Sequence, residues 1–136
     1  MPEKEEVFHI EVDYDTHQVE VNDTIEIQVQ VEFDPPIPIE AGMVVLDVSV
    51  PTGFVPVEET LDEVVGSDPR IKRYDVAARK AIFYVEDMAP GDEVEFKFQA
   101  LACYPVSAKG VTSQAYSYYK PEWKGEALSR EVVVVE

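Results

Sequence analysis

The sequence has little cysteine and few basic residues, and both shortages limit what the protein can be. Cys103 is the only cysteine among the 136 residues, so no disulfide forms within the chain and the core alone must hold the fold. Lysine and arginine total 11 against 28 aspartates and glutamates, a formal net charge of −17. A field of that sign repels nucleic-acid phosphates and anionic lipid, so we expect no nucleic-acid partner.

Long apolar runs and enzyme motifs are also missing. No stretch approaches the roughly 20 apolar residues that span a bilayer, and the first ten residues lack the basic and apolar regions of a signal peptide. We therefore expect no membrane insertion, and an export signal would lie elsewhere. The sequence has no Gly-rich phosphate loop, Gly-x-Ser-x-Gly elbow or Cys–His pairing. These absences favour a non-enzymatic domain without a cofactor.

What the sequence does contain is a series of short alternating segments. Residues 24–33, TIEIQVQVEF, alternate apolar and polar side chains, which predicts a half-buried antiparallel strand. Similar segments, separated by Gly, Pro and Asp or Asn, are VFHIEVDY, HQVEV, MVVLDVSV, IKRYDV, KAIFYVED, DEVEFKFQALAC, SQAYSYY and REVVVV. Eight or nine strands predict an all-β fold, a two-sheet antiparallel β-sandwich, with residues 1–136 as one domain.

Residues 51–65, PTGFVPVEETLDEVV, differ from these strands because they predict a short α-helix. The apolar residues that recur at helical spacing are Val57, Leu61, Val64 and Val65. Pro56 suits the start of a helix and Gly66 its C-terminal cap. The opposite face carries Glu58, Glu59, Asp62 and Glu63. An isolated helix of this length is marginal, so we expect its apolar stripe to dock on the sandwich.

A few polar residues outside this pattern allow a second interpretation. The stretch HIEVDYDTH would place His9, Asp13, Asp15 and His17 on one strand face, but it lacks the spacing signature of a zinc site, and we expect a polar outer face. Asn22 in NDT matches a glycosylation sequon, although turn chemistry between two strands explains it equally well. Cys103 is expected to be a small buried hydrophobe at a strand end.

The segment around the predicted helix carries a resemblance to a known family. MVVLDVSVPTGFVPVEETLDEVV is followed in order by RIKRYDV, AIFYVEDM, PVS and QAYSYYKPE, over residues 43–122. This series resembles the C-terminal receptor-binding domain of the α2-macroglobulin and complement thioester-protein family. There, a Ser/Thr-Gly-Phe-hydrophobic-Pro turn enters one helix, and a Val-Tyr-x-Tyr-Tyr-acid strand lies near the end. The resemblance implies a β-sandwich with one short α-helix in a crossover connection.

The same resemblance implies a role within a larger protein. The chain would be a non-catalytic domain of a protease trap, an endopeptidase inhibitor that is extracellular or in the cell envelope. Its partners would be the thioester domain and other macroglobulin domains of the same parent chain, and proteases would be met only through that parent. The isolated domain is expected to be a monomer. The alternative is a free-standing immunoglobulin-like adhesion or scaffold module, for which VEVNDTIEIQVQV is a common strand pattern.

Two groups of residues are singled out by the family pattern. In vertebrate members, two helix lysines bind acidic receptor modules, and those positions fall on Glu58 and Asp62. Because their charge is reversed, we expect no receptor binding through this site, and the chain resembles a prokaryotic member. In thioester proteins, aromatic residues of this domain keep water from the thioester. By position Tyr118 or Tyr119 would be that shield, whereas Tyr116 is expected in the core.

The thioester itself is not encoded here. It requires a Cys-x-Glu-Gln stretch, because a Cys sulfur joins the side-chain carbonyl of a Gln three residues on. Cys103 stands in LACYPVS, which has no Gln at that spacing. Covalent capture of a protease therefore cannot reside in this chain.

Overall fold

The structure is a computed structural model that describes residues 6–136. In this part of the chain it contains twelve strands and one helix, α1 (Glu58–Ser67). The first strands are β1 (Phe8–Tyr14), β2 (Gln18–Glu20), β3 (Thr24–Phe33), β4 (Val44–Ser49), β5 (Phe54–Pro56) and β6 (Ile71–Ala77). The others are β7 (Lys80–Val85), β8 (Glu93–Ala102), β9 (Val106–Ala108), β10 (Thr112–Ser117), β11 (Lys124–Leu128) and β12 (Val132–Val135).

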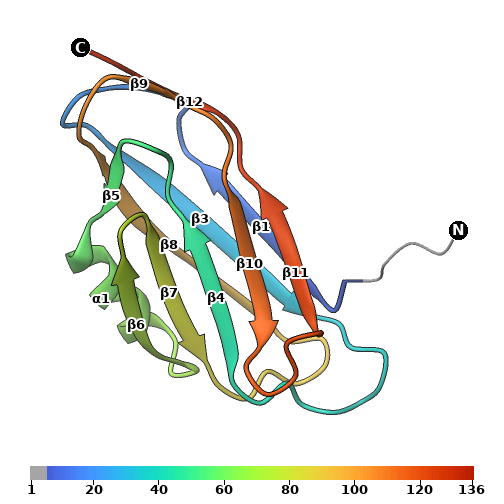
Figure 1. Ribbon diagram of the computed structural model, residues 1–136. Helices are drawn as coiled ribbons and strands as arrows, with labels where there is room; N and C mark the ends of the chain where they lie inside the picture. The colour runs from blue at the N-terminus through green and yellow to red at the C-terminus, as the bar shows by residue number, and fades with distance from the viewer. Residues whose placement is uncertain (1–5) are drawn as a thin grey trace, which may run out of the picture.

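These strands form a β-sandwich of two larger sheets with a small third sheet at one end (Figure 1). One sheet has the order β1-β3-β8-β5 and the other the order β11-β10-β4-β7-β6, and all pairs in both are antiparallel. The third sheet, β2-β12-β9, contains a parallel pair between β12 and β2. The expected all-β sandwich is confirmed, and the third sheet adds to it.

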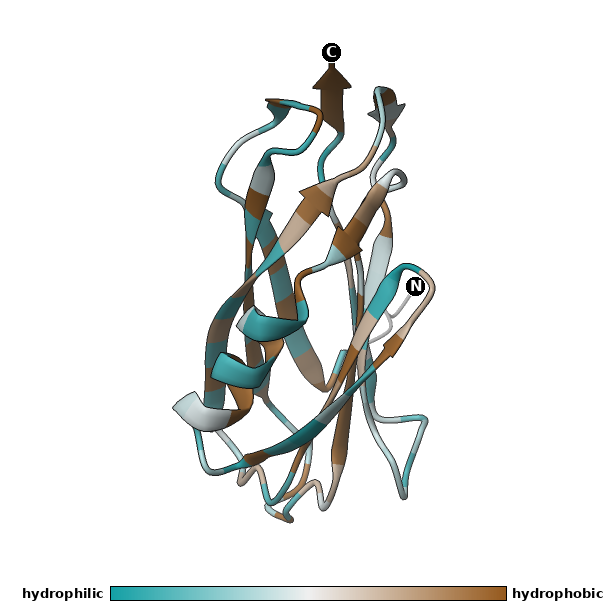
Figure 2. Cartoon of the chain, turned by 90° about the vertical axis from the view of Figure 1, so that its left-hand side faces the viewer, coloured by the Kyte–Doolittle hydropathy of each residue, from teal (hydrophilic) through white to brown (hydrophobic). Residues whose placement is uncertain are grey.

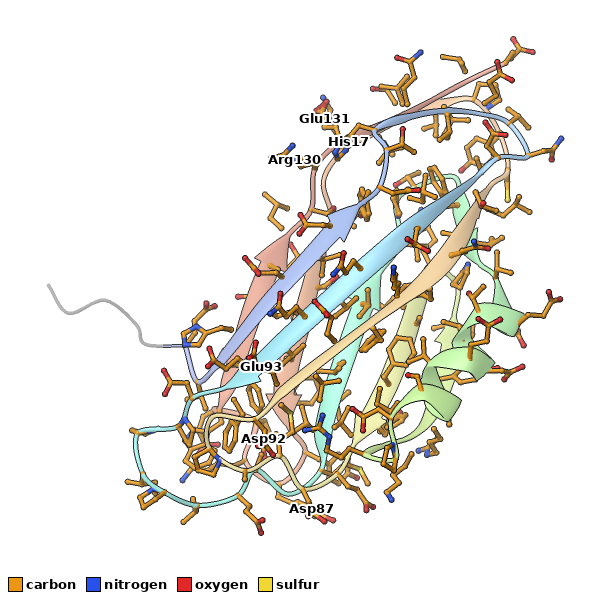
Figure 3. The ribbon with its side chains drawn as sticks, turned by 180° about the vertical axis from the view of Figure 1, so that it is seen from behind. His17, Asp87, Asp92, Glu93, Arg130 and Glu131 are labelled. Carbon is orange, nitrogen blue, oxygen red and sulfur yellow. The ribbon has the colours of Figure 1, made fainter. Side chains whose placement is uncertain are left out.

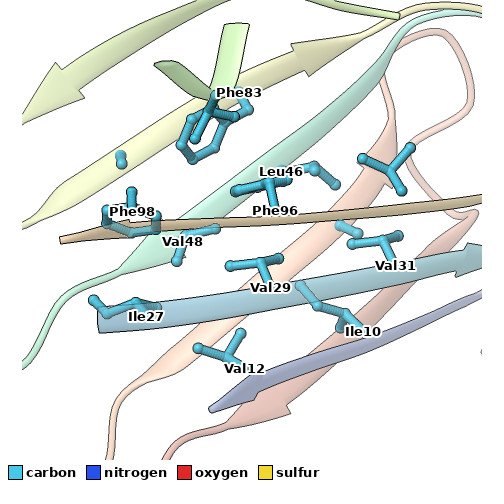
Figure 4. Close-up of a cluster of buried hydrophobic side chains, with 14 of the residues drawn as sticks. Ile10, Val12, Ile27, Val29, Val31, Leu46, Val48, Phe83, Phe96 and Phe98 are labelled. Carbon is cyan, nitrogen blue, oxygen red and sulfur yellow. The ribbon is translucent and has the colours of Figure 1, made fainter. Parts of the chain in front are cut away.

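The core lies between the two larger sheets, as the alternating pattern requires. Every second residue of β3, from Ile25 to Phe33, is fully buried. Figure 4 shows three of these residues, Ile27, Val29 and Val31. With Phe96 and Phe98 of β8 they face Leu46, Val48 and Phe83 of the other sheet. The ring centroids of Phe83 and Phe96 are 4.6 Å apart, within the range of favourable aromatic pairs.

At one edge of the sandwich, β1 of the four-stranded sheet lies beside β11 of the five-stranded sheet. Gly125 of β11 is buried there, and a Cβ atom at this position would collide with the carbonyl oxygen of Phe8. The backbone N–H of Val7 donates to the carbonyl oxygen of Lys124 at 3.2 Å. The absence of a side chain at Gly125 therefore allows this edge of the sandwich to close.

Helix α1 connects the four-stranded sheet to the five-stranded sheet, which confirms a helix in a crossover connection. Leu61 and Val64 are buried against the sandwich, and the acidic face points to solvent (Figure 2). The predicted ends were wrong by one to two residues. The N-cap is Val57 rather than Pro56, and Gly66 lies inside the last turn, with Asp68 as the C-cap. The hydroxyl of Ser67 donates to the carbonyl of Val64, so the helix continues past the glycine.

Two smaller observations complete the fold. Asn22 is exposed in the turn between β2 and β3 and has a φ of +77°, a conformation that Asn tolerates better than most residues. This geometry supports the turn interpretation, while glycosylation stays a prediction. Within residues 6–136, no helix has the length and apolar character needed to cross a membrane.

Candidate interdomain surface

Two adjacent tyrosines stand out on the surface directly after β10. Tyr118 is 57% exposed and Tyr119 is 75% exposed, and their rings form an edge-to-face pair with centroids 5.3 Å apart. Burial of a large aromatic ring is favourable, so two exposed rings in contact are typical of an interaction surface. The shield hypothesis requires at least one exposed ring among the three tyrosines of this segment, and the structure has two.

The backbone beneath the tyrosine pair is fixed by the segment that precedes β4. The N–H of Tyr118 donates to the carbonyl oxygen of Met43 at 2.8 Å, and the hydroxyl of Ser117 donates to that of Ala41 at 3.0 Å. Gly42, between these acceptors, has a φ of +70°, and a Cβ atom there would lie 3.1 Å from the Tyr119 ring. The pair is therefore held on an ordered base, with a glycine where the ring needs room.

Tyr116 is not in the core, contrary to the sequence prediction. It is half-buried on the outer face of the five-stranded sheet, where it pairs with Val45, and Val45 pairs with Tyr84. The prediction rested on Tyr116 sharing a strand face with Tyr118, but β10 ends at Ser117, before Tyr118. The inward residues are instead the small Ser113, Ala115 and Ser117, which face β1 of the other sheet.

The Pro-rich loop between β3 and β4 adds two exposed apolar side chains that sequence reasoning missed. Ile37 and Ile39 are each 47% exposed. The end of this loop, residues 41–43, supplies the carbonyl groups that anchor the tyrosine pair. Two isoleucines in a loop, without strand alternation to bury them, were the available signal. We call Ile37, Ile39, Tyr118 and Tyr119 the tyrosine-end surface.

The described chain begins close to this surface. Phe8 stacks on Phe33 with centroids 5.0 Å apart, and Phe33 lies 5.9 Å from Trp123. The ammonium group of Lys120 lies over the Trp123 ring, 4.7 Å from its centroid. This aromatic cluster links the start of β1 to the loop that carries Tyr119.

The acidic helix face is a separate site on another edge of the sandwich, as Figure 1 shows for α1. Glu58 is exposed, and Asp62 accepts a hydrogen bond from the Tyr74 hydroxyl at 2.7 Å. That hydrogen bond, together with the nearby negative charges of Asp62 and Glu58, raises the pKa of Tyr74 to about 12. The two residues at the receptor-lysine positions thus present carboxylates, one of which is bonded within the domain.

Cys103 is exposed rather than buried, so that prediction was wrong. It comes one residue after β8 ends, where the alternation that would turn it inward no longer applies, and its sulfur lies 3.6 Å from the Leu101 carbonyl oxygen. The thiol is available to reagents, but no Gln follows it at the spacing of a thioester.

The four polar residues of HIEVDYDTH do not share one strand face, because β1 ends at Tyr14. His9 lies 3.2 Å from Asp34, whereas His17 lies beyond the strand and its carbonyl oxygen accepts from Val133. Figure 3 shows His17 near Arg130 and Glu131 at one end of the sandwich. Across residues 6–136, no group of three or more His, Cys, Asp or Glu side chains is placed to hold a metal ion.

Similar folds occur in bacterial proteins. Native Escherichia coli α2-macroglobulin, in a crystal structure spanning domain MG7 to the C-terminus, matches with a TM-score of 0.75 at 14% identity over 96% of this chain and 24% of that chain. A cryo-EM reconstruction of its native conformation gives a TM-score of 0.79 at 14% identity, over 96% of this chain and 9% of that one. Salmonella α2-macroglobulin reacted with methylamine gives 0.71 at 17% identity, over 99% and 10%.

The chain thus spans a quarter or less of the length of these three structures. No curated protein sequence matches it significantly. A family model described as the A-macroglobulin receptor binding domain matches residues 39–128. This range includes α1, the strands from β4 to β11 and the tyrosine pair. The chain belongs to the A-macroglobulin receptor-binding domain family.

Proposed function

We propose that this chain is one domain of a longer, exported macroglobulin-type protease trap of prokaryotic origin, and that the domain itself has no catalytic activity. Tyr118 and Tyr119 pack against the thioester domain of the same parent chain. They keep water from the thioester bond until the trap is activated, when the contact opens. The observation that carries this proposal is the pair of adjacent, exposed rings on an ordered base.

Three further features support this proposal. The described chain begins near the tyrosine-end surface, so an upstream domain would lie within reach. The structurally similar chains are several times longer and belong to α2-macroglobulins; the E. coli protein has been activated by porcine elastase and the Salmonella protein reacted with methylamine. Ile37 and Ile39 are exposed in the loop whose end anchors the pair, and burying such apolar area against another domain is favourable at about 25 cal/mol per Å².

The proposal is tested by the chemistry of the thioester in the parent protein. Methylamine attacks the thioester carbonyl, an amide forms, and the cysteine leaves as a free thiol that a colorimetric reagent detects. We expect the double substitution Tyr118→Ala and Tyr119→Ala to release the thiol about tenfold faster, since one aromatic contact contributes up to about 1.5 kcal/mol.

Tyr104→Ala is the matched control, because Tyr104 is 50% exposed but follows β8 at the opposite end of the sandwich. The parent protein that carries Tyr104→Ala is expected to release its thiol at the rate of the unmodified parent. Equal rates for the double variant and the parent, with both folded, would rule out shielding by the tyrosine pair.

The helix face leads to a second part of the proposal, which concerns binding partners that the domain does not have. Glu58 and Asp62 present negative charge to acidic lipoprotein-receptor-type modules, so the two surfaces repel. Surface plasmon resonance with such a module should give no measurable affinity. A measurable affinity that disappeared after substitution of Glu58 or Asp62 would contradict this.

A further inference from the structure

Acidic residues are absent from three stretches that lie far apart in the sequence. Residues 96–121, 48–57 and 76–85 contain no Asp or Glu, although the chain has 28 of them among 136 residues. These are the three longest acid-free stretches in the sequence. They cover the connection from β4 to β5, the turn between β6 and β7, and the chain from β8 to the end of β10.

The fold brings parts of all three stretches together around one pocket of about 350 Å³, and every lining residue comes from them. The lining consists of Ser49, Val50, Thr52, Arg79, Lys80 and Val111, with two alanines at the β6–β7 turn. In Figure 1, the β4–β5 connection, the β6–β7 turn and the start of β10 all lie toward the same end of the sandwich. The tyrosine pair follows the other end of β10.

The charge of this pocket is opposite to that of the molecule. Its two charged lining residues, Arg79 and Lys80, are both cations. The ammonium nitrogen of Lys80 lies 3.0 Å from a carboxylate oxygen of Asp47, which partly neutralises its charge. Arg79 forms no ion pair within residues 6–136. At physiological salt, charges beyond about 8 Å are largely screened, so the local cations dominate the potential that a ligand meets in the pocket.

The pocket is also held in place by backbone hydrogen bonding. The carbonyl oxygen of Arg79 accepts from the N–H of Val50 at 2.9 Å, which ties the β6–β7 turn to the end of β4. The N–H of Val111 donates to the Ser129 hydroxyl at 3.0 Å, which fixes the lining residue that precedes β10. These bonds fix the backbone around the pocket, so binding would chiefly order the exposed Arg79 side chain.

The side chains around the pocket match a carboxylate on a short aliphatic stem. The planar guanidinium of Arg79 can donate two parallel hydrogen bonds to a carboxylate, and the Ser49 and Thr52 hydroxyls can donate more. Val50 and Val111 offer apolar contact to methylene groups. We propose that this pocket binds a glutamate side chain on a partner polypeptide, with Arg79 as the main contact. A carboxylate matches the charge of Arg79, the lining cation without an ion pair in the described part of the chain, whereas a phosphate dianion would carry one more charge than Arg79 neutralises.

This contact is independent of the tyrosine-end surface, since the two lie toward opposite ends of the sandwich. It gives the domain a second site through which an acidic neighbour can be held. The proposal does not depend on a thioester, and it can be tested on the chain as it stands.

The test is a titration of the isotope-labelled chain with acetylated, amidated tetraglutamate, followed by backbone amide shifts in NMR spectra. We expect saturable shifts at Val50, Arg79 and Val111, and none with the matching tetraglutamine peptide. Arg79→Gln should weaken the affinity about tenfold, the loss expected when one charge-assisted hydrogen bond is removed. Arg130→Gln removes the same charge outside the lining and should change the affinity less than about twofold.

Three outcomes would overturn the proposal. The first is that tetraglutamate shifts no pocket amide. The second is that Arg130→Gln weakens binding as much as Arg79→Gln, which would indicate general charge attraction. Inorganic phosphate could shift the same amides while tetraglutamate does not, which would assign the pocket to a small anion. In each case, unchanged thermal unfolding of both variants shows that the comparison concerns folded protein.

Discussion

Replacing Leu61 by alanine is expected to destabilise the domain by about 3 kcal/mol. Leu61 is fully buried at the contact between α1 and the sandwich. The substitution removes three carbons, worth about 2.4 kcal/mol at roughly 0.8 kcal/mol each, and adds a cavity term. Because α1 is exposed on its other face, the helix can settle into part of the space, so the cost stays near the lower end of the usual range of about 2–5 kcal/mol.

Urea unfolding measures this loss, with Trp123 as a single buried fluorophore. With a denaturant slope of about 2 kcal/mol per molar, the midpoint should fall by about 1.5 M. Glu63→Ala, an exposed neighbour on the same helix, should stay within about 0.5 kcal/mol. A loss below about 1 kcal/mol for Leu61→Ala would refute the docking argument. Loss of the helical circular dichroism before the Trp123 transition would equally show that α1 is not part of the cooperative unit.

Three other predictions follow from single contacts. Asp62→Asn should lower the pKa of Tyr74 from about 12 toward its usual value, because the bonded carboxylate is lost; an unchanged ultraviolet titration would exclude the bond. Gly66→Ala should stabilise the helix by about 0.5–1 kcal/mol, whereas Gly125→Ala should lower the thermal midpoint sharply, since only the second meets backbone; similar midpoints for both variants would contradict the packing. Cys103 should react with a thiol reagent in the native protein as fast as after unfolding, and a protected thiol would contradict its exposure.

Strands with strict alternation were predictable because one buried face fixes both the period and the register. Thr24–Phe33 is predicted from the sequence with the bounds that the structure gives. The strands that sequence reasoning missed are short or lack alternating apolar residues. Val106–Ala108 has three residues, and Lys124–Leu128 contains Gly125, whose contact is made by backbone rather than by a side chain. Such strands are specified by neighbours distant in the sequence.

The site residues also divide into those that the sequence locates and those whose placement depends on distant parts of the fold. The order of motifs located Tyr118 and Tyr119 within the expected strand SQAYSYY, but their exposure depends on β10 ending at Ser117, which the local pattern does not show. Whether Tyr116 points inward depends on the packing of β10 against β1 of the other sheet, and no local pattern contains that contact. The exposure of Cys103 likewise results from the end of β8. The pocket beside Arg79 is formed by strand ends and a turn that meet only in the folded structure.

The central claim is that this domain works inside a larger thioester protein. The most direct test is the mass of the native gene product in its own cells, measured by antibody blot and intact mass spectrometry. The account predicts a product many times larger than 15.3 kDa, with a Cys-x-Glu-Gln stretch upstream of the domain. A product near 15.3 kDa would contradict it and would leave a free-standing immunoglobulin-like module, in which Tyr118 and Tyr119 have no thioester to cover.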